Sequence, residues 1–150
     1  MTSIHLYNAT KKDIQNIYDL LVEYKETDLA NANYPAIDKN KLLNFINTIY
    51  VKGRIILISD LDTDELIGCC MFNVSEYFFS TQKIMTIQMI YIKKKYRNFK
   101  LVKQIVKSVK ELAENMPIVL SITSGLGIDP VFKKLGFEKF GQSIVDANVQ

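Results

Sequence analysis

The residues best suited to bind a ligand lie in a basic turn between an apolar segment and an amphipathic segment. The apolar run Ile84–Ile92 leads into the turn KKKYR at 93–97, and a helix is expected from about Asn98 to Asn115. The first amides of a helix have no partner within it, and the helix dipole is positive there, so a phosphate placed at that end is stabilised. Arg97 could add a two-pronged contact. The sequence therefore predicts an anion-binding strand–turn–helix unit from Ile84 to about Leu112.

The positive charge of the chain is concentrated in this unit. The whole chain has 19 basic and 16 acidic residues, a net charge of +3. Between Lys93 and Lys110 eight residues are basic and none is acidic, which leaves 11 basic residues (19 less 8) against the 16 acids elsewhere. Local charge of this kind indicates an anionic ligand or partner, although a lysine-rich helix face is also what a solvated surface requires. Phe99 is the only aromatic residue on the helix that could stack on bases, so nucleic acid is the least favoured partner.

The elements that must position this unit follow from hydrophobic periodicity. Strands and helices are expected in the order β-α-α-β-β-β-α-β-α-β, which places the chain in the α/β (α+β) class with a mixed, mostly antiparallel central sheet flanked by helices. We expect one domain over residues 1–150. The expected elements are strands at 4–8, 54–59, 66–74, 84–92, 118–122 and 137–145 and helices at 11–27, 38–53, 98–115 and 130–135.

Composition excludes several classes of protein. No apolar run approaches the roughly 18–20 residues of a membrane span, and the first residues lack the pattern of a signal peptide, so a cytoplasmic protein is expected. Cys69 and Cys70 are adjacent and should point to opposite faces of a strand, which suits reduced thiols better than a disulfide. Their spacing does not fit a zinc site, and His5 is the only histidine, so no metal is expected.

Three short motifs, in their order along the chain, carry a resemblance to a known family. The turn reads IKKKYRNFKLV from Ile92, a second motif reads VFKKLGFE from Val131, and Ala9-Thr10-x-x-Asp13 opens the first helix. This pattern resembles the GNAT N-acetyltransferases, in which the corresponding motifs are V-x-P-x-x-R-x-x-G-x-G/A and F/L-Y-x-K-L-G-F. Ile92 stands in the place of the valine and Arg97 in the place of the arginine.

The resemblance implies a cofactor, an activity and a set of binding residues. A GNAT enzyme is a transferase that moves acetyl from acetyl-CoA, its co-substrate, to a primary amine of a small molecule or protein. The acceptor site in this fold would lie around residues 23–37 and 76–80, and because family members often dimerise, a homodimer is among the implied assemblies. By position the residues implied for cofactor binding are Met89, Tyr91, Ile92, Arg97, Asn98, Phe99, Lys100, Leu101 and Val102.

The chain departs from the family pattern where the chemistry is expected. Lys100 and Val102 replace two residues that are usually glycine, or glycine and alanine, and Phe132 replaces a tyrosine that commonly protonates the leaving thiolate. Thr86 and Gln88 stand near the usual catalytic glutamate, and neither is a base near pH 7. Catalytic residues therefore stay unassigned; the substitutes considered are Tyr91, Glu76, Tyr77 and a bound water.

Two functions are carried forward from the sequence. The first is an active acetyl-CoA-dependent N-acyltransferase, in which positioning supplies much of the rate without the usual acid and base. The alternative is a catalytically inactive GNAT-like module that binds or regulates.

Overall fold

The computed structural model describes residues 3–30, 33–121, 129–139 and 141. Its elements follow the predicted order as far as the last helix. The predicted final strand at 137–145 lies largely outside the described residues, and the part that is described, 137–139 and 141, has no strand. The elements are β1 (Ile4–Asn8), α1 (Ile14–Thr27), α2 (Lys39–Lys52), β2 (Arg54–Asp60), β3 (Glu65–Glu76), β4 (Lys83–Ile92), α3 (Phe99–Ala113), β5 (Ile118–Leu120) and α4 (Asp129–Lys134), with 3₁₀ turns at Lys11–Asp13 and Lys94–Tyr96.

The sheet has five strands in the order β1-β2-β3-β4-β5. The first three neighbouring pairs are antiparallel, and β4 with β5 is parallel. A parallel pair needs a crossover, which α3 provides between the two strands. The mixed, mostly antiparallel sheet predicted from the sequence is thereby confirmed.

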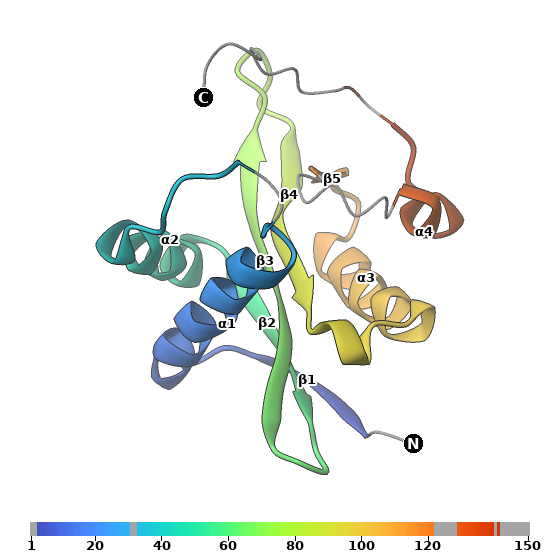
Figure 1. Ribbon diagram of the computed structural model, residues 1–150. Coiled ribbons are helices and arrows are strands. Elements are labelled where there is room, and N and C mark those ends of the chain that lie inside the picture. The colour runs from blue at the N-terminus through green and yellow to red at the C-terminus, as the bar shows by residue number, and fades with distance from the viewer. Residues whose placement is uncertain (1–2, 31–32, 122–128, 140, 142–150) are drawn as a thin grey trace.

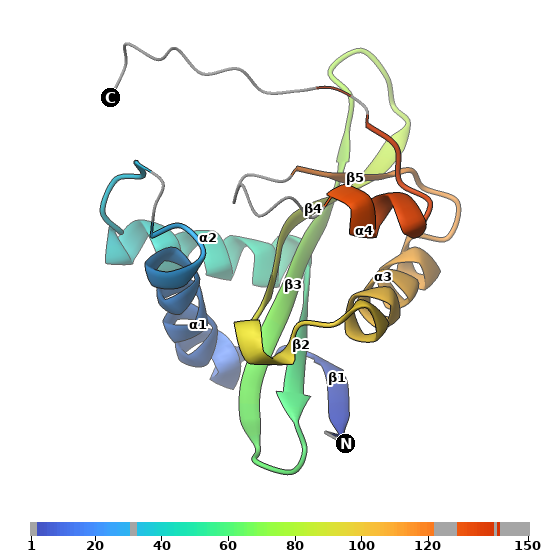
Figure 2. The ribbon, with the colours of Figure 1, turned by 45° about the vertical axis from the view of Figure 1, so that its right-hand side comes forward.

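Helices cover both faces of this sheet (Figure 1). The helices α1 and α2 lie on one side, and α3 with α4 lies on the other. Figure 2 shows that the β3–β4 hairpin extends past the helices at one end of the sheet, whereas the β2–β3 turn lies at the opposite end. None of the helices formed by the described residues is long and apolar enough to cross a membrane.

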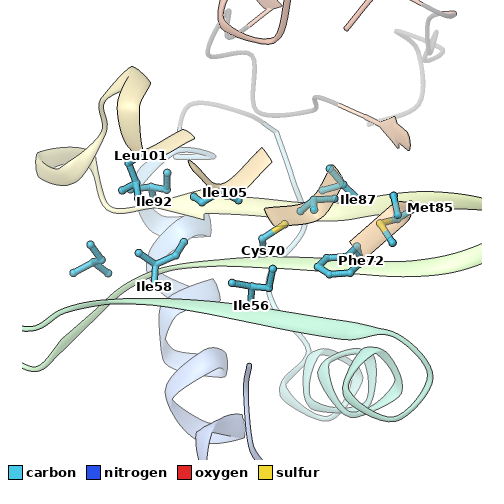
Figure 3. Close-up of a cluster of buried hydrophobic side chains, with 12 residues drawn as sticks. Ile56, Ile58, Cys70, Phe72, Met85, Ile87, Ile92, Leu101 and Ile105 are labelled. Carbon is cyan, nitrogen blue, oxygen red and sulfur yellow. The ribbon is translucent and has the colours of Figure 1, made fainter. Parts of the chain in front are cut away.

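Each face of the sheet has its own hydrophobic core because side chains alternate along the strands. Figure 3 shows the α3-side core, in which Ile56 and Ile58 of β2 lie below Leu101 and Ile105 of α3. The other core joins α1 and α2 to the opposite face of the same strands. Cys70 belongs to the α3 side and its neighbour Cys69 to the α1 side, and both are free thiols, as predicted. Both are also fully buried.

The helices begin where capping residues were expected. The Asp13 carboxylate accepts hydrogen bonds from the N–H and the hydroxyl of Thr10 at 2.7 and 3.0 Å, and Asp38 accepts from the Lys41 amide at 3.0 Å. Such bonds satisfy amides that have no partner inside the helix. The first turn after Thr10 is a 3₁₀ turn, so α1 proper starts at Ile14.

Candidate functional site

Strand β4 is paired along one edge and only briefly along the other. Its parallel pairing with β5 is confined to Met85–Ile87 against Ile118–Leu120. On the β3 side, Met71 faces Met89 and Phe72 faces Ile87, so Gln88 is an extra residue in β4. A bulge of this kind bends the strand and increases its twist. Beyond Gln88, no described strand pairs with the β5-side edge of β4. The Ile92 carbonyl on this edge accepts from Arg97, and the backbone groups between Gln88 and Ile92 are available to a ligand.

Glycine at position 68 allows β3 to approach the end of β4 closely. A Cβ atom placed on Gly68 would stand 2.6 Å from the carbonyl oxygen of Tyr91 and 3.3 Å from Cα of Ile92. Only glycine fits this distance without a backbone shift. The residue therefore sets the position of the strand end that leads into the basic turn.

The basic turn presents free amides at the start of α3. Asn98 caps the helix: its side-chain oxygen accepts from the Leu101 amide at 2.8 Å, and its carbonyl accepts from the Val102 amide at 3.2 Å. Among the described residues, none accepts a hydrogen bond from the N–H of Phe99 or Lys100. Two unpartnered amides at the positive end of a 15-residue helix suit the oxygens of a phosphate.

Arg97 is held inside the protein by two partners. Its Nε donates to the Ile92 carbonyl at 2.7 Å, and its Nη2 donates to both carboxylate oxygens of Asp28 at 2.7 and 2.6 Å. The guanidinium carbon lies 5.7 Å from the centre of the Tyr91 ring. In the structure the guanidinium of Arg97 thus binds the Asp28 carboxylate. A contact between Arg97 and a phosphate stays a prediction. The sequence did not identify Asp28 as the partner of Arg97, although an acid at the end of a helix, where the dipole disfavours it, is a signal of a cationic partner.

The other residues predicted to bind a cofactor divide into three groups. Ile92 and Leu101 are buried in the α3-side core, so only their backbone groups can reach a ligand. Val102 is partly buried against that same core. Phe99 and Lys100 are exposed at the start of the helix. The side chains of Met89 and Tyr91 belong to the α1-side core instead.

Tyr91 connects β4 to the end of α1. It is 2% exposed, and burial raises the pKa of its hydroxyl. That hydroxyl lies 3.5 Å from the Thr27 hydroxyl and 3.5 Å from a carboxylate oxygen of Glu23. Its polar contacts are thus with α1, which makes Tyr91 a link between layers rather than a group facing the β5-side edge.

The remaining catalytic candidates have structural partners. Glu76 forms an ion pair with Lys83, and the Tyr77 ring stacks on Phe79 with centroids 5.4 Å apart, both where β3 ends. Phe132, in the place of the family tyrosine, is 5% exposed and packs edge-on against Phe137. None of these contacts places an acid or a base beside the bulge.

A neutral polar patch lies at the bulge, where Asn73 and Ser75, which were not identified from the sequence, join Gln88 and Thr86. The Gln88 side chain donates to the Asn73 side-chain oxygen at 2.8 Å, and the Ser75 and Thr86 hydroxyls are 3.5 Å apart. Asn73 follows Phe72 in β3, and Phe72 lies in the α3-side core. Because neighbouring strand residues point to opposite faces, the polar side chains of this patch lie on the α1–α2 face. The polar residues Asn73 and Ser75, at alternate positions after Phe72, are the sequence pattern that could have predicted this patch.

This sheet, with its bulged fourth strand and capped third helix, defines a mixed α/β fold of the acetyltransferase kind. Residues 20–150 match the family described as acetyltransferase (GNAT) domain, and the chain belongs to that family. A comparison with curated proteins finds no match.

Solved structures share the fold at low sequence identity. A predicted acetyltransferase from Clostridium acetobutylicum, solved with acetyl-CoA, superposes with a TM-score of 0.75 at 18% identity over 95% of each chain. A possible acetyltransferase from Clostridium difficile 630 gives 0.72 at 13% over 98% of each chain. The glucosamine-6-phosphate N-acetyltransferase of Arabidopsis thaliana gives 0.70 at 12%, over 96% of this chain and 97% of that one. At these identities the likeness establishes the fold.

Proposed function

We propose that the protein is an N-acetyltransferase that moves acetyl from acetyl-CoA to a primary amine of a small molecule or protein. Family membership supports acetyltransferase activity in general. Two observations carry the proposal for this chain: the unpaired edge of β4, and the free amides of Phe99 and Lys100, which follow that edge along the chain. A strand edge and a helix start, joined in this way, match a long ligand that has amides in its arm and phosphates at its end.

The residues present fit such a ligand. The pyrophosphate would lie on the Phe99 and Lys100 amides, with the exposed ammonium groups of Lys94 and Lys100 near it. The amide-bearing arm would pair with the backbone of β4 between Met89 and Tyr91. Because Val102 packs against the core, its side chain is directed away from the open start of the helix. When bound, acetyl-CoA supplies an activated acyl group as a thioester.

The chemistry that remains for the protein is positioning. The acceptor nitrogen attacks the carbonyl carbon, so that the C–N bond forms while the C–S bond breaks. The proton lost by nitrogen passes to water, and the thiolate leaves and takes a proton from water. The amides of Gln88 and Asn73 lie at the bulge, where they can orient an acceptor by hydrogen bonds. Orientation of two reactants can account for a large part of a rate enhancement.

One pair of variants tests the binding site at a single atom. Phe99 is the first residue of α3, where proline is well tolerated, and the preceding Asn98 is already extended. Phe99→Pro therefore removes one amide hydrogen, while Phe99→Ala removes the side chain and keeps that hydrogen. We expect calorimetry to show wild-type acetyl-CoA affinity for Phe99→Ala and a loss of about 10–100-fold for Phe99→Pro, since a hydrogen bond to a charged group contributes about 1.5–3 kcal/mol. Equal affinities in both variants would rule out the amide site.

A catalytically inactive binding module is the second candidate function. It is favoured by the burial of Phe132 and by the neutral patch at the bulge. Release of free thiol from acetyl-CoA in the presence of a panel of primary amines distinguishes the two functions. Thiol release that depends on an amine supports the transferase, whereas tight binding of acetyl-CoA without such release supports the binding module.

A further inference from the structure

A cavity of about 700 Å³ lies on the α1 side of the sheet, at the end that carries the β2–β3 turn. It is lined by residues of β1, β2 and α1, by the β2–β3 turn and by the start of β3. It is separate from the bulge in β4. Lys93, at its edge, is four residues beyond Met89, or about 13 Å along an extended strand. An amine bound in this cavity would therefore be too far from the bulge to be the acceptor of the proposed reaction.

The charge of the cavity lining is strongly negative. Four carboxylates and a single lysine line it. Lys93 is bound to Glu65 at 2.8 Å and to Glu23 at 3.3 Å. Asp19 and Asp64 are exposed, and among the described residues neither forms an ion pair. The cavity thus has two carboxylates whose charge no cation of the described chain balances.

An unpartnered hydroxyl in the lining is an independent sign of a ligand. Ser59 is 8% exposed and lines the cavity. It follows Ile55 and Leu57 on the α1 face of β2, so its side chain points the same way. No described residue forms a hydrogen bond with the Ser59 hydroxyl. Every fully buried side-chain oxygen in the described chain has a hydrogen-bonding partner, so the Ser59 oxygen is not fully buried and is open to the cavity. The Ser59 hydroxyl is therefore free to form a hydrogen bond with a ligand in the cavity.

The lining also offers aromatic faces. His5 and Tyr7 alternate on β1, and their rings stack with centroids 5.3 Å apart and planes 12° apart. Burial raises the pKa of Tyr7, with Asp13 and Asp64 adding to the effect, so the phenol stays neutral. The phenol ring of Tyr7, beside carboxylates that have no ion-pair partner, favours a cationic ligand.

We propose that this cavity binds a small organic cation with primary ammonium groups. One ammonium group donates to the carboxylates of Asp19 and Asp64, and another N–H donates to the oxygen of Ser59. The site is independent of the acetyl-CoA site proposed above.

A matched pair of probes tests the site in the whole chain without acetyl-CoA. The probe is 1,4-diaminobutane, and 1,4-butanediol has the same length without the charge. In calorimetric titrations at constant ionic strength, we expect saturable binding of the diamine at up to millimolar concentration and none of the diol. Equal heats from the two compounds, or no saturable heat from the diamine, would overturn the proposal.

Variants assign the binding to the cavity. Asp19→Asn with Asp64→Asn alters two exposed side chains and should weaken diamine binding by about tenfold or more, and Ser59→Ala should weaken it several-fold. Glu111→Gln removes an exposed acid from α3, on the other side of the sheet, and should leave the affinity unchanged. An equal loss in Glu111→Gln would show general attraction to an acidic surface and would contradict a site. Thermal unfolding of each variant checks that it is folded.

Discussion

Asp28, the residue after α1, binds the guanidinium of Arg97 in the turn before α3. Both carboxylate oxygens accept from one nitrogen, at 2.7 and 2.6 Å, across 69 positions of the sequence. The Asp28 side chain is only 9% exposed and the Arg97 side chain 29%. The turn that would hold the phosphates is therefore tied to a helix on the opposite side of the sheet.

Loss of this pair should destabilise the protein. Asp28→Asn should lower the free energy of unfolding by about 1–3 kcal/mol, because charge-assisted hydrogen bonds are lost and Arg97 is left half-buried without its partner. Arg97→Lys should have a similar effect, since an ammonium group cannot contact both Asp28 and the Ile92 carbonyl as a planar fork does. Urea unfolding measures both. Glu26 is an exposed acid at the same end of α1, so Glu26→Gln is the control. An equal loss of stability in Glu26→Gln would show that the Asp28–Arg97 pair contributes little.

Gly68→Ala should move β3 away from β4. The new methyl group would meet the Tyr91 carbonyl and the side chain of Ile58, which lies 3.1 Å from the Cβ position. We expect a loss of about 1–3 kcal/mol in the free energy of unfolding, as overpacked positions show. Gly141→Ala serves as a control, because a Cβ there meets nothing within 4 Å. Wild-type stability in Gly68→Ala would contradict the close approach.

The two thiols should be unreactive in the native protein. Burial raises the pKa of Cys69 to about 12 and raises that of Cys70 further, with help from its neighbour. The thiolate is the reactive form, and neither side chain is exposed. A thiol-labelling assay at pH 8 should count no thiols in buffer and two per chain in denaturant. Rapid labelling of either thiol in buffer would contradict this burial.

The stabilising effect of Glu65 should depend on pH. The hydrogen bond from Lys93 lowers the pKa of Glu65, whose ordinary value is about 4.3. Because the pKa of Glu65 is lowered in the folded protein, its stabilising effect is present at pH values above the ordinary pKa. The effect is lost as the pH falls through the pKa of the folded state. Glu65→Gln should thus cost less than about 1 kcal/mol at pH 7, and the difference from wild type should shrink below pH of about 4. A difference that is constant from pH 7 to pH 3 would contradict the ion pair.

Local patterns predicted the elements well, whereas contacts between distant segments were not predictable. The helix expected at 98–115 is α3 at Phe99–Ala113, because its periodicity and the cap at Asn98 are read from neighbouring residues. The bulge at Gln88 depends on the register with β3, which no local pattern specifies. The partner of Arg97 and the cavity beneath α1 both require the folded sheet, since their residues come from several elements.

The unpaired edge of β4 has a consequence for solution behaviour as well as for binding. A strand whose N–H and C=O groups are free on one side is also a template on which another chain can add a strand. In the part of the chain that the structure describes, this edge begins at Gln88, and the apolar residues around it favour such growth. A ligand that pairs with the edge should protect it. Light scattering on mild heating is therefore expected to rise more slowly with saturating acetyl-CoA than with the same concentration of adenosine.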